Sequence, residues 1–230
     1  MLYKDAYLYL AFLFVLTIIA FWPVYFARLA DVDPLIHAHT VLGMIWLGLM
    51  ITQAWLARSR QFGKHRLIGK SSYVIAPAFL VTSLIIFRSF LDMNTEFEQL
   101  LAVQITFYDL TGVLLFAVAF TLALTKYKHD IQMHARLMIA TLAFLIFPVV
   151  SRIFLFYASF GMGAMDILLT GIYATEILFL ALIIHDWRSG KNYPVYPAVL
   201  AFVGVQHIGF LYSSNWQWWV DFAAFYGGRS

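Results

Sequence analysis

Long apolar segments alternate with short polar connections along the whole chain, and this pattern predicts helices that cross a membrane. One crossing of a bilayer needs about 20 apolar residues in a helix, whereas the strands of a membrane barrel show short alternating segments. The apolar runs are continuous here, so we expect an all-α bundle forming a single transmembrane domain over residues 1–230. We expect seven spans, at about residues 6–29, 35–57, 68–90, 99–125, 134–158, 166–186 and 195–214.

The composition supports a membrane protein and excludes several other classes. Of the 230 residues, 63% are hydrophobic and 12% are charged, whereas charged residues make up about a quarter of a soluble domain. The net charge of +3 comes from basic residues that lie between apolar segments, so we expect a lipid bilayer as partner and no nucleic acid. The chain has no cysteine, which excludes disulfides, iron–sulfur clusters and thiolate metal sites.

The charges of the connections predict which side of the membrane each one faces. Every second connection is basic; these contain Arg58, Arg60, Lys64, Arg66 and Lys70, then Lys126, Lys128 and Arg136, then Arg188 and Lys191. The connections between them are acidic or nearly neutral; these contain Asp31 and Asp33, then Asp92, Glu96 and Glu98, then Asp166. Basic connections face the cytoplasm, so we expect the amino terminus inside and the carboxyl terminus outside.

An aromatic segment, NWQWWVDFAAFYGGRS, follows the last predicted span at residues 215–230. Tryptophan and tyrosine rings favour the boundary between lipid and water. We therefore expect a short interfacial segment on the outer surface of the membrane. Its rings are Trp216, Trp218, Trp219, Phe222 and Tyr226.

Five ionisable residues lie within predicted spans, where a charge is costly and commonly functional. They are His39, Asp109, Arg152, Glu176 and His207. With a rise of about 1.5 Å per residue, all five fall in the outer half of the bilayer, each on a different helix. One arginine cannot neutralise two carboxylates, so either one carboxyl group holds a proton or a bound cation completes the balance. A purely structural ion-paired network is the competing interpretation.

A second polar layer lies at the cytoplasmic ends of the spans. His65 opens the third predicted span and His134 opens the fifth. Two neutral imidazoles are sufficient to ligate a haem iron, and Arg66 or Lys70 would then lie near the haem propionates. The competing interpretation is that these histidines are solvated residues flanking the spans.

Four segments resemble the bacterial polytopic membrane proteins catalogued as domain of unknown function 2306. They are HAHTVLGMIWLGLMITQAWLARSR, HRLIGKSSYVIAP, the YD pair at 108–109 and HARLMIATLAFLIFPVVSRI, within residues 35–155. The resemblance implies a shared fold and the inner membrane of a bacterium. That family has no established activity, so the resemblance implies no function.

The chain also resembles, more faintly, the di-haem transmembrane cytochromes of the ascorbate-dependent type. In those proteins parallel helices pair their histidines, one haem at each membrane side, and His65 with His134 would correspond to the cytoplasmic pair. The outer pair departs from the pattern, because Asp109 stands where a second histidine would accompany His39. The resemblance therefore implies one haem b, or none, rather than two.

Three functions fit these residues. The first is a haem-binding redox or electron-transfer protein, with His65 and His134 as ligands and a quinone or other membrane subunits as partners. The second is a metal-dependent enzyme in which His39, His207, Asp109 and Glu176 hold zinc, iron or copper, with Asp109, Glu176 and Arg152 as catalytic groups. The third is a proton-coupled transporter or an accessory subunit of a membrane complex, in which Asp109 and Glu176 titrate beside Arg152. We rank the redox protein first, because histidines lie at both membrane faces, and leave open whether the protein is an enzyme.

Overall fold

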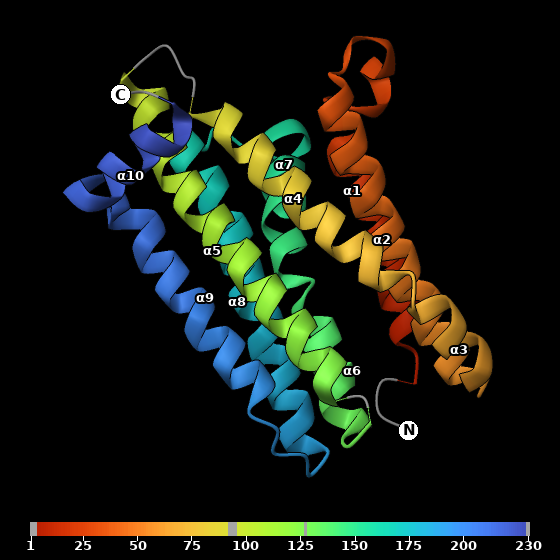
Figure 1. Ribbon diagram of the computed structural model, residues 1–230. Helices are drawn as coiled ribbons and strands as arrows, with labels where there is room; N and C mark the ends of the chain where they lie inside the picture. Colours follow the sequence, from red (N-terminus) through yellow and green to blue (C-terminus); the bar gives the residue numbers. More distant parts are fainter. Residues whose placement is uncertain (1–3, 92–95, 127, 229–230) are drawn as a thin grey trace. The chain divides into compact units, whose positions relative to one another are not determined.

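The structure is a computed structural model that describes all residues except 1–3, 92–95, 127 and 229–230. Its regular elements are all helical, which confirms the predicted all-α class (Figure 1). The α-helices of the described residues are α1 (Ala6–Phe21), α2 (Pro34–Arg58), α3 (Phe62–Gly69), α4 (Ser72–Phe90), α5 (Glu96–Lys126), α6 (Ile131–Ala140), α7 (Ala143–Tyr157), α8 (Ala164–Arg188), α9 (Val195–Tyr212) and α10 (Gln217–Gly227). Two short 3₁₀ helices are η1 (Phe26–Asp31) and η2 (Ser213–Asn215). Asp92, in a predicted acidic connection, lies outside the described residues.

Six helical segments in the described part of the chain are long and apolar enough to cross a membrane. This supports an integral membrane protein in contact with a lipid bilayer. The segments are Pro34–Arg58, Ser72–Ser89, Leu101–Lys126, Ile131–Tyr157, Ala164–Arg188 and Val195–Asn215.

The first predicted span, at 6–29, is shorter in the structure than the sequence suggested. The α-helix α1 has 16 residues and ends at Phe21, which gives it a length of ~24 Å, less than the ~30 Å hydrocarbon core of a bilayer. Pro23 follows two residues later, and a proline cannot continue a helix because it has no N–H and its ring clashes with the preceding turn. A seventh span is therefore not confirmed, nor is the placement of the two termini on opposite sides.

Two other predicted spans are interrupted. The chain enters the span predicted at 68–90 through a separate short helix, α3, before α4 begins at Ser72. The span predicted at 134–158 consists of two helices, α6 and α7, which meet at Thr141 and Leu142. There the N–H of Leu142 donates to the carbonyl of Ile139, three residues back, at 2.9 Å, a tighter turn than the α-helical one.

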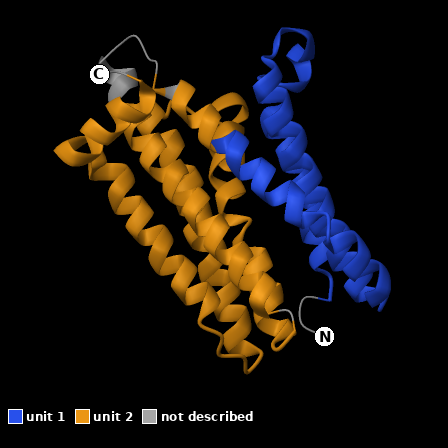
Figure 2. Ribbon diagram, in the orientation of Figure 1, with its two compact units in different colours: residues 1–83 blue, residues 84–230 orange. Residues whose placement is uncertain are grey.

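The chain divides into two compact units, residues 1–83 and 84–230, with the boundary inside α4 (Figure 2). In the first unit, α2 packs against both α1 and α3. In the second unit, α5 and α8 each pack against α7 and α9, and α6 packs against α5 and α9. The single domain expected from the sequence stays a prediction.

Close backbone approach holds the second unit together. A Cβ atom at Gly209 of α9 would lie 1.9 Å from the Phe107 ring of α5, and one at Gly171 of α8 would lie 2.6 Å from the Phe147 carbonyl oxygen of α7. Small residues of this kind let membrane helices pack tightly. A buried cluster of Tyr108, Phe147, Ile172 and Phe210 fills the space between these four helices.

The described part of the predicted interfacial aromatic segment, residues 215–228, contains the helix α10, which packs on α5. The Trp219 indole Nε1 donates to the Val103 carbonyl oxygen at 3.1 Å, and the Tyr226 hydroxyl donates to the Leu84 carbonyl. Burial raises the pKa of the Tyr226 phenol, and the opposing influence of Arg88 is smaller. The phenol therefore stays protonated at neutral pH and keeps its hydrogen bond.

Candidate functional site

Glu176 and His207, two of the ionisable residues predicted within the spans, are in direct contact. The imidazole Nδ1 of His207, on α9, lies 2.8 Å from the carboxylate Oε1 of Glu176, on α8. Both side chains are mostly covered, with 19% of His207 and 26% of Glu176 exposed. The Tyr173 ring packs edge-on against the imidazole, with centroids 5.4 Å apart. A carboxylate and an imidazole in direct contact can share, take up or release a proton.

A second pair of ionisable residues is Asp109 of α5 and Arg152 of α7. Asp109 is 9% exposed, and Arg152 and Asp109 attract each other electrostatically. The Arg152 guanidinium also donates from Nη1 to the carbonyl of Pro148, one turn back, at 3.1 Å. This hydrogen bond holds the guanidinium against its own helix. The positive charge that acts on Asp109 is therefore held in one position.

Tyr108 links the two pairs. It neighbours Asp109 in the chain, and the charges of both Asp109 and Glu176 act on its phenol. The phenol shares a hydrogen bond with Thr175, the residue before Glu176. Because the Thr175 hydroxyl already donates to the Gly171 carbonyl at 2.9 Å, the threonine oxygen is the acceptor for the tyrosine proton. We call Tyr108, Asp109, Arg152, Glu176 and His207 the intramembrane polar cluster.

Gln206 stabilises the α9 side of this cluster. Its carboxamide Nε2 donates to the backbone carbonyl of Tyr108 and to the Thr111 hydroxyl, both at 3.0 Å. Gln206 is 2% exposed, so these bonds fix α9 to α5 next to His207. The sequence analysis gave no site role to Gln206 or to Tyr108, because neither side chain is charged at neutral pH.

His39 lies in the first unit. Its Nδ1 lies 3.3 Å from the Thr82 hydroxyl, and its ring stacks on Phe79 with centroids 4.9 Å apart. The Thr82 hydroxyl donates to backbone carbonyls of its own helix, so it accepts from the imidazole N–H. The predicted participation of His39 in a metal site stays a prediction.

The structure does not support the predicted metal site. Among the residues it describes, no group of three or more His, Asp or Glu side chains is placed to hold a metal ion. Glu176 and His207 do come together, and they would supply two ligands of the proposed four.

The predicted haem ligands each contact a backbone carbonyl oxygen. His134 Nδ1 lies 3.0 Å from the Ala123 carbonyl oxygen. A carbonyl can only accept, so the ring proton is on Nδ1 and the lone pair is on Nε2, the arrangement common in iron-ligating histidines. His65 Nδ1 lies 3.2 Å from the Gln53 carbonyl oxygen.

His65 lies on α3, where the Gln53 side chain of α2 contacts the backbone. With the Gln53 carboxamide oriented to donate to the His65 carbonyl at 3.0 Å, its oxygen accepts from the Gly69 N–H at 3.2 Å. Gln53 therefore ties α3 to α2. Arg66 and Lys70 are exposed to solvent. Because His65 lies in the first unit and His134 in the second, their pairing around one haem stays a prediction.

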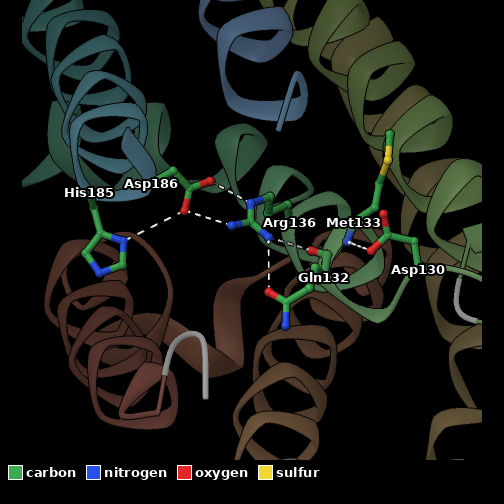
Figure 3. Close-up of polar contacts among 6 residues, drawn as sticks. All are labelled: Asp130, Gln132, Met133, Arg136, His185 and Asp186. Atoms are coloured by element: carbon green, nitrogen blue, oxygen red, sulfur yellow. Dashed lines mark hydrogen bonds and ion pairs between the residues drawn. The ribbon is translucent and has the colours of Figure 1, made fainter. Parts of the chain in front are cut away.

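Sequence reasoning missed a buried ion pair between Arg136 and Asp186 (Figure 3). The Arg136 Nε lies 2.6 Å from Asp186 Oδ2, and its Nη2 lies 2.9 Å from Oδ1, so the pair is bidentate. Arg136 is fully buried and Asp186 is 4% exposed. The guanidinium also donates from Nη1 to the Gln132 carbonyl at 3.0 Å and stacks on Tyr193, 3.9 Å from the ring centroid.

The sequence prediction counts Arg136 with a basic connection, and it does not single out Asp186, the last residue of the span predicted at 166–186. Arg136 counted as one basic loop charge, but Asp130 caps α6 by accepting from the Met133 N–H at 2.9 Å, so that Arg136 lies inside the helix. Asp186 belongs to the last turn of α8. Its presence as an acidic residue in an otherwise basic connection was the signal that could have revealed it.

Comparisons with protein-family models, with curated proteins and with solved structures gave no match. The class of protein therefore follows from its fold and its site. It is a helical membrane protein with ionisable side chains in contact within its apolar helices.

Proposed function

We propose that the second unit transfers protons within the bilayer, as in a proton-coupled transporter. The observation that carries this proposal is the 2.8 Å contact between Glu176 and His207 inside two apolar helices. Ionisable residues at such positions commonly form proton relays. The cluster contains one permanently charged group, Arg152, and several groups that can gain or lose a proton.

Each residue of the cluster has a part in the proposed transfer. His207 and Glu176 exchange a proton through their hydrogen bond. Tyr108, which contacts Thr175 and lies beside Asp109, provides a hydroxyl between the two carboxyl groups. Arg152 is the positive charge that acts on Asp109, the second carboxyl group of the proposed transfer.

The test is proton flux into liposomes that contain the purified protein and a pH-sensitive dye. A potassium gradient with valinomycin supplies the driving voltage. We expect flux well above that of empty liposomes, and loss of most of it in Glu176→Gln and Asp109→Asn. Asp221→Asn is the matched control, because it removes a carboxylate from α10, outside the six long apolar segments. Flux equal to that of empty liposomes, or unchanged in both cluster variants, contradicts the proposal.

A second candidate, favoured by the hydrogen bond of His134 to Ala123, is a haem-binding redox protein. His65 and His134 would each supply a ring nitrogen to the iron of haem b, and Arg66 or Lys70 would lie near the propionates. The bound haem would supply one-electron chemistry. A difference spectrum of the dithionite-reduced and oxidised protein tests this, with a Soret band expected in the wild type and lost in His134→Ala. A featureless spectrum from cells supplied with haem rejects it.

Kinship with the domain of unknown function 2306 proteins, and location in a bacterial inner membrane, remain proposals. They rest on the resemblance of residues 35–155. Both proposals are compatible with either function, because that family has no established activity.

A further inference from the structure

A cavity of about 340 Å³ lies where α8 ends and α9 begins. Its walls include Ile183, Trp187, Lys191, Tyr193 and Tyr196. Small-molecule sites in proteins commonly have volumes of about 300–1,000 Å³. The cavity lies at a membrane boundary, because one apolar segment ends at Arg188 and the next begins at Val195.

The chain that forms the cavity is held in place. The Lys191 N–H donates to the Asp186 carbonyl oxygen at 2.9 Å, which closes the turn after α8. Gly190 adopts a left-handed conformation within that turn, with φ of 66°. The Arg136 guanidinium packs on the Tyr193 ring and fixes that wall. The cavity is thus formed before any ligand binds.

The charge of the cavity favours an anion. The Asp186 carboxylate lines it but is bound on both oxygens by Arg136, so its negative charge is neutralised. Lys191 then supplies the positive charge at the rim, where it is exposed. The amino-terminal end of α9 adds a partial positive charge.

An exposed apolar stripe runs along α8 to the cavity. Leu180, Ile184 and Trp187 are 49%, 39% and 72% exposed, and their spacing of four and three residues places them on one face of the helix. An acyl chain can lie along such a stripe. A free phosphate would make no use of it, so the stripe distinguishes a lipid from a soluble anion.

We propose that this cavity binds the phosphate group of an anionic phospholipid. Lys191 contacts the phosphate, Trp187 and Tyr193 surround the glycerol region, and an acyl chain lies along Leu180 and Ile184. Basic cavities at the ends of membrane helices are suited to anionic headgroups, which gather at the membrane surface.

The test is native mass spectrometry of the intact protein in detergent, titrated with phosphatidylglycerol, phosphatidylcholine or glycerol 1-phosphate. We expect phosphatidylglycerol to bind several-fold more tightly than phosphatidylcholine, and glycerol 1-phosphate to bind weakly. Lys191→Gln abolishes the preference for phosphatidylglycerol, whereas Lys191→Arg keeps it. Trp187→Ala weakens the binding of both lipids, because it removes apolar contact and no charge.

Lys64→Gln is the matched control, since it removes one exposed positive charge from α3. An equal loss of binding in Lys64→Gln and Lys191→Gln overturns the proposal, because it indicates attraction by surface charge in general. Equal binding of the two lipids in the wild type also overturns it. Tight binding of glycerol 1-phosphate overturns the lipid as the occupant and assigns the cavity to a soluble phosphate.

Discussion

The ion pair of Arg136 and Asp186 is almost completely buried, with 0% and 5% of the two side chains exposed. Its two hydrogen bonds and the stacking on Tyr193 satisfy both charges. A buried ion pair stabilises the folded state little more than two apolar side chains of similar size would. Removal of one partner is costly, because it leaves the other charge buried and uncompensated. The pair therefore specifies how the ends of α6 and α8 meet.

Asp186→Ala is expected to lower the free energy of unfolding by about 3–5 kcal/mol, because it leaves the guanidinium uncompensated. Unfolding in mixed micelles with increasing sodium dodecyl sulfate measures this. Asp221→Ala is the control, since Asp221 is exposed, and a change within about 0.5 kcal/mol is expected there. If the double variant Arg136→Met, Asp186→Leu is no more stable than Asp186→Ala, the isolated charge is not the cause.

Ionisable residues within apolar runs could be singled out from the sequence, whereas the buried pair of Arg136 and Asp186 could not. Glu176 and His207 attract notice because a charge in a span is costly, although their roles stay predictions. Arg136 lies only six residues from Asp130, the cap of α6, and a count of loop charges cannot tell a buried arginine from a solvated one. Tyr108 owes its position between two carboxyl groups to the packing of helices distant in the chain.

Glycines allow helices of the second unit to pack closely. In α9, Gly209 faces the Phe107 ring with no room for a Cβ atom, whereas Gly204 has nothing within 4 Å of one. The two positions share a helix and differ in their neighbours. Replacing each of them by alanine therefore distinguishes the effect of helix propensity on stability from the effect of close packing.

Gly209→Ala is expected to lower the melting temperature of the detergent-solubilised protein, because the methyl group forces α9 away from α5. Gly204→Ala is expected to leave it unchanged or raise it, since alanine is preferred to glycine in a helix by roughly 0.5–1 kcal/mol. Thermal unfolding followed by tryptophan fluorescence compares the two. Similar shifts in both variants would show that the contact of Gly209 with Phe107 contributes nothing.

Helix boundaries were predicted well where the apolar run ends in charges, and less well elsewhere. The span predicted at 35–57 corresponds to α2, which begins at Pro34 after the capping residue Asp33 and ends at Arg58. Hydropathy could not predict the end of α1 before Pro23, or the break between α6 and α7, because the residues on both sides remain apolar. Local hydrogen bonding decides those positions.

The whole molecule is an all-α membrane protein whose number of crossings depends on α1. Six segments meet the length and composition of a span, and α1 is the shorter apolar helix beside them. If α1 crosses, the two termini lie on opposite sides. The alternation of basic and acidic connections predicts that the carboxyl terminus is then outside.

Reporter fusions at each terminus test this topology. Alkaline phosphatase is active only outside the cytoplasm, and green fluorescent protein fluoresces only inside it. We expect fluorescence from an amino-terminal fusion and phosphatase activity from a carboxyl-terminal one. Both termini on the same side would mean an even number of crossings and would contradict a seventh span.

The most direct measurement of the central claim is infrared difference spectroscopy of the protein in lipid as the pH is changed. It detects protonation of carboxyl groups in an apolar environment by their C=O stretch. The account predicts a carboxylic acid band that gains intensity as the pH falls and is altered in Glu176→Gln, while Asp221→Asn leaves it unchanged. A spectrum without such a band, or one identical in Glu176→Gln, would contradict proton exchange at the intramembrane polar cluster.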